Sequence, residues 1–393
     1  MPSDQSTWLI AAPQDGDSEG LLQEVYSKLS QQSKTFSRNN IGQLSIPSFK
    51  TGTLDSLVSL SEELPKQDSA FTAVVAKIVD TLRNLLNNDP SKLSQHILVN
   101  EQSVDEYLLQ DWRWNEGRYG VQRGLREMVD VLVKEINSID NVMKAKLNSY
   151  NLAKGSLTQL QRKKTGNLSV RSLADIVRKE DFIQDSEYME TLLVAVPKNL
   201  VKEWNAKYER LTSMVVPRSA AAIDSDDEYT LYSVVIFRRV HDEFLQKCRE
   251  NKFMVRDFNF SEDLLSKERE ELDTADTTEK ELWTELLRLS RTNFSEAFQI
   301  LVHLKIVRLF IESVLRYGLP SNYTGLAIKP EPKSTKRTLT TLQTHFTYLS
   351  PRFSGAAGSK KGGASDDFVG EYQTLLEQEF FDFVLYEVPW IVN

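Results

Sequence analysis

The chain has 393 residues, 40% of them hydrophobic and 26% charged, and a net charge of −8 from 48 basic and 56 acidic residues. This length allows two or three folded domains, whereas the acidic balance disfavours a general nucleic-acid binder, which needs basic residues against phosphates. The one cysteine, Cys248, excludes an internal disulfide and a cysteine-based zinc site, and we expect it to be half-buried. No signal peptide and no membrane-spanning apolar stretch is apparent, so we expect a cytoplasmic protein.

The predicted elements begin with a strand and two helices within residues 1–117. Residues 7–13 (TWLIAAP) form the short apolar run of a buried strand. Residues 21–29 and 68–86 repeat apolar side chains at helical spacing. We expect these elements to form the N-terminal part of a mixed α/β domain, which we call the foot.

Residues 118–165 are predicted to form one long helix, the first of two that make up a helical neck. Apolar or small side chains recur from Leu125 to Leu160 mostly at steps of three and four, which indicates one buried stripe. Proline is absent from this run, and Gly155 costs only about 1 kcal/mol relative to alanine. Nothing is therefore expected to interrupt the helix.

Residues 166–260 are predicted to form a small α/β domain, which we call the head. Short apolar runs rich in β-branched and aromatic residues indicate strands, and segments with helical spacing separate them. The expected strands are residues 190–197, 229–237 and 253–260, and the expected helices are residues 199–213 and 238–251. This alternation of strands and helices is typical of a compact mixed domain.

Residues 261–317 are predicted to form the second neck helix. Ser261 is a residue type that favours an N-cap, and apolar side chains follow at helical spacing from Leu264 to Val314. Gly318 and Pro320 come directly after the helix, and a glycine followed by a proline is typical of a helix end.

Residues 318–393 are predicted to complete the foot with strands at residues 323–330 and 382–391. A sheet that combines these strands with residues 7–13 would build the foot from both ends of the chain. Between them, residues 351–367 are rich in glycine, serine and lysine, which favours a surface loop.

The two neck helices are predicted to pack antiparallel and to make an elongated α+β protein. Each helix would be roughly 65 to 80 Å long, whereas a compact globule of this chain length has a radius of gyration of about 21 Å. Residues 144–164 carry six basic and no acidic side chains, and residues 261–281 carry nine acidic and three basic ones. Antiparallel packing would place these opposite charges side by side. The alternative, that both charged blocks are only solvated helix faces, stays open.

No motif with a known catalytic or cofactor-binding mechanism is complete in this sequence. The glycine-rich run near the C-terminus has Ala364 where a phosphate-binding loop requires lysine. The acidic residues 224–228 resemble the start of a calcium loop, but Tyr229 and Val235 occupy the positions of its glycine and glutamate. The four histidines are scattered, and His303 is expected to be a packed or surface histidine beside the second helical stripe. We therefore expect no catalytic residue, no cofactor and no metal site.

Several blocks of the sequence resemble the C subunit of the vacuolar-type proton-translocating ATPase (V-ATPase). The most specific block is residues 162–182 (RKKTGNLSVRSLADIVRKEDF), and the other blocks follow in the order expected for the family. These are residues 7–13, 54–64, 193–198, 215–220, 256–263, 312–320 and 383–388. The resemblance runs from about residue 7 to the end of the chain, and it is weakest at residues 15–43 and 351–367.

The resemblance implies a non-catalytic structural and regulatory stator subunit with a head, a neck and a foot. The head of such a subunit binds one peripheral stalk, an E–G heterodimer, and the foot binds a second stalk and the cytosolic N-terminal domain of membrane subunit a. Such a subunit resists torque during ATP-hydrolysis-coupled proton transport, on the cytosolic face of the vacuolar or another endomembrane, and leaves the complex reversibly. Actin and nucleotide binding are also associated with the family, but no residue pattern here locates either.

Seven basic residues are the candidates for partner binding: Arg162, Lys163, Lys164, Arg171, Arg178, Arg238 and Arg239. The first three end the first neck helix, the next two follow in the most specific family block, and the last two lie in the head. An equally good interpretation is that the first three only balance the negative charge at the acidic start of the second neck helix. At the foot, Tyr317 and Leu319 fit a core role as well as a contact role.

Two other classes of function stay open from the residues alone. A cytoskeletal cross-linker would bind filaments through both end domains and would co-purify with filament proteins. An unrecognised nucleotide hydrolase would show turnover by the isolated chain that an active-site substitution abolishes.

Overall fold

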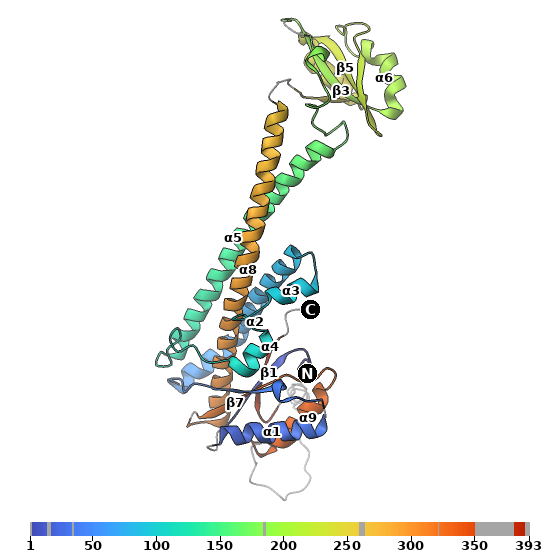
Figure 1. Ribbon diagram of the computed structural model, residues 1–393. Coiled ribbons are helices and arrows are strands. Elements are labelled where there is room, and N and C mark those ends of the chain that lie inside the picture. Colours follow the sequence, from blue (N-terminus) through green and yellow to red (C-terminus); the bar gives the residue numbers. More distant parts are fainter. Residues whose placement is uncertain are drawn as a thin grey trace, which may run out of the picture. The chain divides into compact units, whose positions relative to one another are not determined.

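The structure is a computed structural model that describes residues 2–13, 17–33, 35–183, 186–258, 264–320, 322–349 and 381–389. It is an α+β protein, which confirms the predicted fold class at this level. The chain divides into two compact units. The terminal unit is Met1–Ala145 with Leu286–Asn393, and the central unit is Lys146–Glu285. In the described part of the chain, each unit holds one four-stranded sheet (Figure 1).

The sheet of the terminal unit joins strands from both ends of the chain. Its order is β2 (Ile41–Leu44), β7 (Tyr323–Ile328), β1 (Thr7–Pro13) and β8 (Val384–Val388), and all neighbours are antiparallel. The predicted strand at residues 7–13 is confirmed. The other two predicted strands are shorter than expected, and residues 390–391 of the last one lie outside the described residues, as does the predicted loop at 351–367.

The strand β2 is not predicted, because four residues with a glycine and a glutamine in the middle carry little strand signal. Gly42 is required by packing. A Cβ atom at this position would clash with the backbone carbonyl of Leu109. The edge strand is therefore in close backbone contact with the π-helical turn η2 (Tyr107–Asp111).

Two helices pack on this sheet, α1 (Ser18–Gln32) and α9 (Thr335–Phe346) (Figure 1). Their buried side chains form one core with the strands, and this core includes Trp8, Ile10, Leu22, Val25, Leu326, Leu342 and Phe346. Asp17 begins α1 by accepting a 2.8 Å hydrogen bond from the N–H of Gly20, so the helix starts before the predicted residue 21. The helix α9 is not predicted, because its many threonines lower helix propensity.

The helix α2 (Leu54–Leu85) is longer than the predicted helix at residues 68–86, because Pro65 does not end it. A proline in a helix interior costs about 3 kcal/mol. Burial of an apolar face on both sides of the proline, from Leu57 to Leu82, offsets this cost. The short helices α3 (Pro90–His96) and α4 (Val104–Glu106) follow.

The two longest helices are α5 (Leu125–Thr165) and α8 (Leu264–Tyr317), and each contributes residues to both units. The prediction that α5 starts at residue 118 is wrong, because the two glycines within residues 118–124 favour turns. The helix continues through Gly155, as predicted. The predicted cap Ser261 lies outside the described residues, whereas the predicted end of α8 is confirmed: Gly318 has a φ of +83° and donates its N–H to the carbonyl of Val314 at 2.9 Å.

Residues 300–311 of α8, in the terminal unit, are buried on nearly every side, which differs from the single apolar stripe predicted for this helix. All residues from Ile300 to Ile311 except Arg308 are buried. The helix is surrounded, since Phe310 contacts both Phe49 and Tyr323 with ring centroids 4.9 and 6.0 Å apart. A helix that is apolar all round is typical of a central core element.

The sheet of the central unit has the order β4 (Ala221–Ser225), β5 (Tyr229–Phe237), β3 (Met189–Pro197) and β6 (Met254–Arg256), and all pairs are antiparallel. The predicted strand at residues 229–237 is confirmed, and β3 begins one residue before its prediction. The strand at residues 253–260 was predicted too long, and its last two residues lie outside the described residues. The strand β4 is not predicted, because it is mostly exposed and consists mainly of small and polar residues.

One face of the central sheet is covered by α6 (Val201–Lys207) and α7 (His241–Glu250). The core on this face includes Val194, Trp204, Val234, Phe244 and Cys248. Single 3₁₀ turns flank α6, so the continuous helix predicted at residues 199–213 is wrong. Cys248 is fully buried and not half-buried as expected, and burial raises the pKa of its thiol to about 12.

Within the central unit, α5 and α8 lie side by side and antiparallel. The ammonium group of Lys146 lies 2.6 Å from a carboxylate oxygen of Glu285, and Tyr150 is hydrogen-bonded to Glu279. Leu160 and Leu272 line one shared groove. Residue numbers thus fall along α8 as they rise along α5, and the basic block of α5 lies against the acidic block of α8.

Candidate partner-binding surface

The basic end of α5 lies beside a groove of about 340 Å³ in the central unit. Its lining comes from α5 (Leu160, Lys163, Lys164), from the segment after α5 (Ser172, Asp175) and from α8 (Glu268, Arg269, Glu271, Leu272, Asp273). Arg162, Lys163 and Lys164 are exposed, and no described carboxylate lies within ion-pair distance of them. These three cations therefore face solvent beside the acidic residues of α8 without a direct ion pair to the described ones.

The most specific family block continues as a tightly bonded connecting segment, residues 166–173. The carboxylate of Asp226 accepts hydrogen bonds from the backbone N–H of Leu168 at 2.5 Å, Tyr229 at 2.6 Å and Glu228 at 2.8 Å. Burial alone would raise the pKa of Asp226, but these three bonds lower it overall. The carboxylate fixes the start of the connecting segment to the loop before β5.

Side-chain hydrogen bonds from Arg256 and to Glu268 fix the rest of the connecting segment. Arg256 of β6 donates to the backbone carbonyls of Leu168 at 2.5 Å and Arg171 at 2.8 Å. Burial lowers the pKa of Arg256, but an arginine stays charged, and charged donors make the stronger hydrogen bonds. The hydroxyl of Ser172 donates to the carboxylate of Glu268 on α8 at 2.7 Å. The segment is thus bonded to both the sheet and a long helix.

Arg171 and Arg178 differ in how free their side chains are. The guanidinium of Arg171 lies 2.7 Å from the carboxylate of Asp175, so it takes part in a local ion pair. Arg178 is exposed, and its backbone N–H donates to Asp181 at 2.8 Å. Arg178 is therefore the more available of the two for a partner.

Arg238 and Arg239 lie in a different part of the central unit, in the turn between β5 and α7. Both are exposed, and the backbone N–H of Arg238 donates to the carbonyl of Tyr188 at 2.9 Å, directly before β3. Among the described residues, no hydrogen bond or ion pair links these two arginines to the other five candidates. The structure brings the lysines of α5 near the connecting segment but does not gather all seven residues into one cluster.

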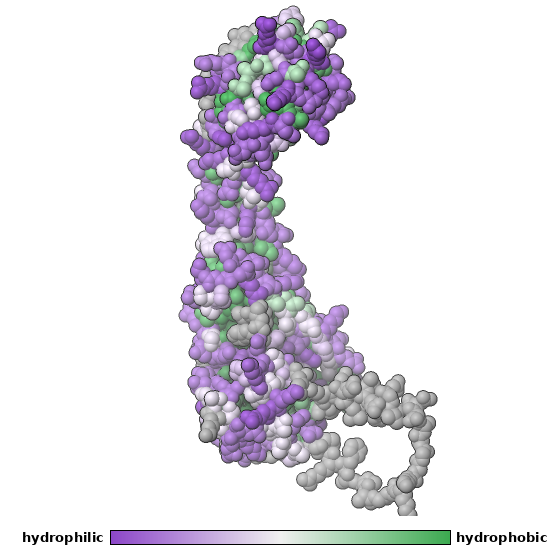
Figure 2. All heavy atoms as spheres, turned by 90° about the vertical axis from the view of Figure 1, so that its right-hand side faces the viewer, coloured by the Kyte–Doolittle hydropathy of each residue, from purple (hydrophilic) through white to green (hydrophobic). Residues whose placement is uncertain are grey.

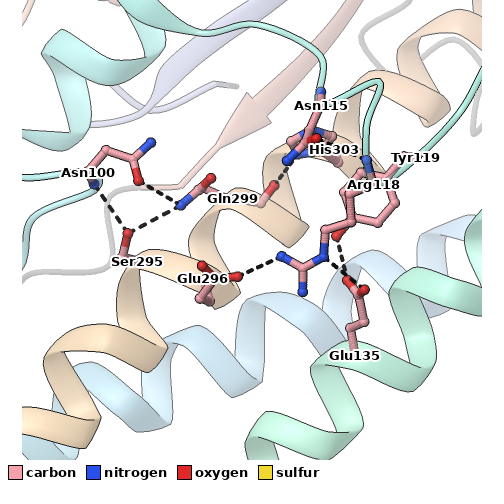
Figure 3. Close-up of polar contacts among 9 residues, drawn as sticks. All are labelled: Asn100, Asn115, Arg118, Tyr119, Glu135, Ser295, Glu296, Gln299 and His303. Atoms are coloured by element: carbon pink, nitrogen blue, oxygen red, sulfur yellow. Dashed lines mark hydrogen bonds and ion pairs between the residues drawn. The ribbon is translucent and has the colours of Figure 1, made fainter.

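In the terminal unit, Arg118 links the two long helices (Figure 3). Its guanidinium lies 2.9 Å from Glu135 of α5 and 2.7 Å from Glu296 of α8. The hydroxyl of Tyr119 also donates to Glu135, at 2.5 Å. Burial alone would lower the pKa of Arg118, but its hydrogen bonds to both carboxylates raise it overall.

His303 of α8 lies near Tyr119 and Arg118 (Figure 3), and aromatic rings enclose its imidazole. The ring centroids of Trp114 and Tyr119 are 4.7 and 4.9 Å from that of the imidazole. Nε2 accepts the backbone N–H of Asn115 at 3.2 Å, so Nδ1 carries the proton and donates to the carbonyl of Gln299 at 2.7 Å. Burial lowers the pKa of His303 to about 4, so the ring is neutral at pH 7. Of the two expected roles, a packed or a surface histidine, the structure shows the packed one, and no motif in the sequence indicates the aromatic rings around it.

The two foot residues have separate roles. Tyr317 donates its hydroxyl hydrogen to the carbonyl of Ala11 at 3.1 Å and accepts the N–H of Val384 at 3.0 Å, so it connects the end of α8 to β1 and β8. Leu319 is 69% exposed. Tyr317 thus has a structural role, and Leu319 is the one of the two that is available for contact.

The described residues contain no group of three or more His, Cys, Asp or Glu side chains arranged to hold a metal ion. The acidic residues 224–228, which resemble the start of a calcium loop, instead place Asp226 on backbone N–H groups. None of the described helices is both long and apolar enough to cross a membrane.

A family model for the V-ATPase C subunit matches residues 7–384. The chain belongs to the family of V-ATPase C subunits. It is 38% identical over 384 residues to the C 1-B subunit of the V-type proton ATPase of Danio rerio and to the C 1 subunit of Xenopus laevis, with 97% of each chain covered. It is 36% identical over 381 residues to the V-type proton ATPase C subunit of Manduca sexta, again over 97% of both chains. The predicted family is thereby confirmed, and membership agrees with the expectation of a non-catalytic subunit.

A solved structure titled the cytoplasmic N-terminal domain of subunit I, homolog of subunit a, of V-ATPase matches 86% of this chain. Its TM-score of 0.35 at 13% sequence identity is too low to support a statement about fold or function.

Proposed function

We propose that this chain is a non-catalytic stator subunit of a V-ATPase. In this role it bridges peripheral stalks, which are E–G heterodimers, and the cytosolic N-terminal domain of membrane subunit a. It is needed for assembly and for ATP-hydrolysis-coupled proton transport, and its release accompanies reversible disassembly. It acts in the cytoplasm and on the cytosolic face of the vacuolar or another endomembrane.

The observation that carries this proposal is the family match over residues 7–384, because it covers both long helices, the sheet of the central unit and the strands β1, β2 and β7 of the terminal sheet. Two structural features support it. Each unit has its own sheet and its own buried core, so each can offer a separate docking surface. The helices α5 and α8 supply residues to both units, as a mechanical link between two docking modules requires.

The proposed division assigns residues 166–260 to a head, 118–165 and 261–317 to a neck, and 1–117 and 318–393 to a foot. The head binds one stalk, and the foot binds a second stalk and subunit a. The exposed cations Arg162, Lys163, Lys164 and Arg178 are the proposed stalk contacts at the end of α5 and after it. A paired-helix neck transmits torque between these modules better than a flexible linker.

A two-step experiment tests the proposal. Small-angle scattering of the purified chain is expected to give a radius of gyration well above the roughly 21 Å of a compact globule of this length. Titration with purified E–G heterodimer, and then with the N-terminal domain of subunit a, is expected to give a ternary complex. A compact profile would contradict the architecture, and the absence of binding to both partners would contradict the function.

A further inference from the structure

A polar pocket of about 390 Å³ lies in the terminal unit between α1, α9 and one end of the sheet. The two helices lie side by side (Figure 1), and the ammonium group of Lys28 on α1 is 2.8 Å from Nδ1 of His345 on α9. The lining residues come from the end of β1 and from α1 (Pro13, Asp17, Gly20, Leu21, Glu24), from β7 (Thr324) and from the end of α9 and the turn after it (His345, Tyr348). Hydrophilic residues make up most of the coloured surface on the face that Figure 2 draws. The pocket differs from such a surface because two of its polar side chains are buried.

These two side chains have polar atoms without a hydrogen-bond partner among the described residues, namely Oγ1 of Thr324 and Nε2 of His345. Thr324 is 4% exposed and His345 is 9% exposed. An ammonium group can only donate, so Nδ1 of His345 accepts from Lys28 and Nε2 carries the proton. Burial, and then the charge of Lys28, lower the pKa of His345, which keeps the ring neutral. The pocket therefore presents one N–H that needs an acceptor and one hydroxyl that can donate or accept.

The position of Thr324 in the sheet makes its hydroxyl informative. Side chains alternate between faces along a strand, so Thr324 lies on the same face as Leu326 and Ile328, which belong to the apolar core under α1 and α9. A buried hydroxyl without a partner lowers stability, and valine would fill nearly the same volume without this cost. A polar ligand that bonds to the hydroxyl would account for a threonine at this end of the core.

Two carboxylates of α1 make the pocket negatively charged. Asp17, Leu21 and Glu24 follow each other at steps of four and three residues, so they lie on one face of the helix. Asp17 to Glu24 covers roughly 10 Å of helix at 1.5 Å per residue. A Cβ atom at Gly20 would clash with the carboxylate of Asp17, so the glycine leaves room for this group. No described cation lies within ion-pair distance of either carboxylate.

We propose that this pocket binds an amino alcohol, a small aliphatic amine that also carries a hydroxyl group. The ammonium group pairs with the carboxylates of α1, the alkyl chain covers Leu21 between them, and the hydroxyl oxygen accepts the Nε2 proton of His345. The hydroxyl of Thr324 bonds to the same ligand oxygen. The pocket has both apolar and charged lining, and the buried atoms select the oxygen of the ligand.

Other ligand classes match the pocket less well. A plain amine leaves the N–H of His345 without an acceptor, and leaving a buried donor unpaired is unfavourable. An anion is repelled by Asp17 and Glu24. A metal ion does not fit, because no described group of three or more His, Cys, Asp or Glu side chains is arranged to hold one.

The test is a titration of the full chain with aminopentanol, which has an amine and a hydroxyl at opposite ends of its carbon chain. Isotope-labelled histidine gives ring signals from four residues, and the signal missing in His345→Gln identifies that of His345. This signal is expected to shift and to saturate. The dissociation constant is expected to be at least tenfold lower than for pentylamine, which lacks the hydroxyl, and for pentanediol, which lacks the amine. Absence of saturation, or equally tight binding of pentylamine, would overturn the inference.

Conservative variants separate ligand contacts from structural roles. Asp17→Asn removes a charge but keeps a good N-cap, and Glu24→Gln removes the second charge at an exposed position. The double variant D17N/E24Q is expected to weaken binding at least tenfold. Thr324→Val is expected to weaken it several-fold without lowering the melting temperature of the ligand-free chain.

The matched control is Glu19→Gln, which changes an exposed carboxylate in the first turn of α1 outside the pocket lining. It is expected to bind aminopentanol like the wild type. Wild-type affinity in both D17N/E24Q and Thr324→Val would show that the ligand does not occupy this pocket. That result would leave the proposed stator role untouched, because the titration uses the chain without any other subunit.

Discussion

The ammonium group of Lys305 lies 2.8 Å from Oδ1 of Asp68, and only 8% of either side chain is exposed. A second cation, Arg308, places Nη1 2.6 Å from Oδ2 of the same carboxylate. Its Cζ lies 4.3 Å from the ring centroid of Tyr386. Burial lowers the pKa of Lys305, while the attraction of Asp68 opposes this shift. The three charges connect α2 to the buried part of α8 and, through Tyr386, to β8.

Replacement of Asp68 by alanine is expected to destabilise the terminal unit by about 3–5 kcal/mol, because it leaves the buried Lys305 and the half-buried Arg308 without their counter-ion. The control is Asp80→Ala on the same helix, where an exposed carboxylate pairs with Arg83 at 3.2 Å. This control should change stability by no more than about 0.5 kcal/mol. Urea unfolding followed by tryptophan fluorescence measures both. A loss below about 1 kcal/mol for Asp68→Ala would contradict the assigned role of the triad.

The stability of the terminal unit is expected to fall on acidification because His303 resists protonation in the fold. Its pKa is about 4 in the folded chain, against an ordinary value of 6.5. Between these values the unfolded chain binds a proton that the folded chain does not. The contribution of His303 to the free energy of unfolding is therefore fully present above pH 6.5 and is lost as the pH falls toward 4. Arg118 lowers this pKa, and Glu135 opposes it. This difference in pKa corresponds to about 3 kcal/mol in the free energy of unfolding.

Unfolding free energies of the wild type and of His303→Gln, measured from about pH 7 to about pH 4, isolate this effect from the titration of carboxylates common to both. The wild type is expected to lose about 3 kcal/mol more than the variant over this range. Equal pH dependence of the two proteins, or an NMR titration of His303 near its ordinary pKa of 6.5, would contradict the neutral caged imidazole.

Arg256→Met is expected to loosen the connecting segment without unfolding the sheet. It removes the charged donor to the carbonyls of Leu168 and Arg171, and hydrogen bonds to charged groups contribute about 1.5–3 kcal/mol. Hydrogen exchange of the amides in residues 166–173 should therefore accelerate at least tenfold. Arg249→Met, at an exposed position of α7, should leave the exchange of these amides unchanged. Unaltered exchange in Arg256→Met would show that other contacts hold the segment.

Charge reversal at Arg178 is expected to slow association with E–G heterodimer several-fold and to reduce its salt dependence, because exposed charges at the edge of an interface act mainly on the association rate. Arg171→Glu should have a mixed effect, since it also breaks the pair with Asp175. Stopped-flow association at two salt concentrations measures both, with Lys202→Glu as the control. Wild-type rates for the variant R171E/R178E would remove both residues from the set of stalk contacts.

The fold was predictable where local periodicity and end signals agree. The first long helix was found because apolar side chains recur at helical spacing from Leu125 to Leu160. The end of the second was found because Gly318 and Pro320 follow it directly. Pro65 misled the prediction of α2, because tertiary burial outweighed its local cost. The strands β2 and β4 were missed, because short edge strands with polar or small residues are stabilised mainly by their neighbours.

The candidate surface was predictable only as a set of exposed charges. Nothing in the spacing of Arg256, Asp226 and residues 166–173 shows that one side chain of β6 binds the carbonyls of a segment 85 residues or more away in the chain. The exposure of Phe237 and Met214 was equally unpredictable, since both resemble ordinary strand and loop residues until the topology leaves them uncovered. Long-range pairing of this kind leaves no periodic mark in a single sequence.

The most direct test of the stator role is ATP-driven proton uptake by membranes whose V-ATPase lacks its own C subunit. Addition of the purified chain together with the soluble catalytic sector is expected to restore acidification, measured as quenching of a pH-sensitive dye, and the same chain without that sector is expected to give none. Assembly of the full complex with this chain bound but without any recovery of proton uptake would contradict the account.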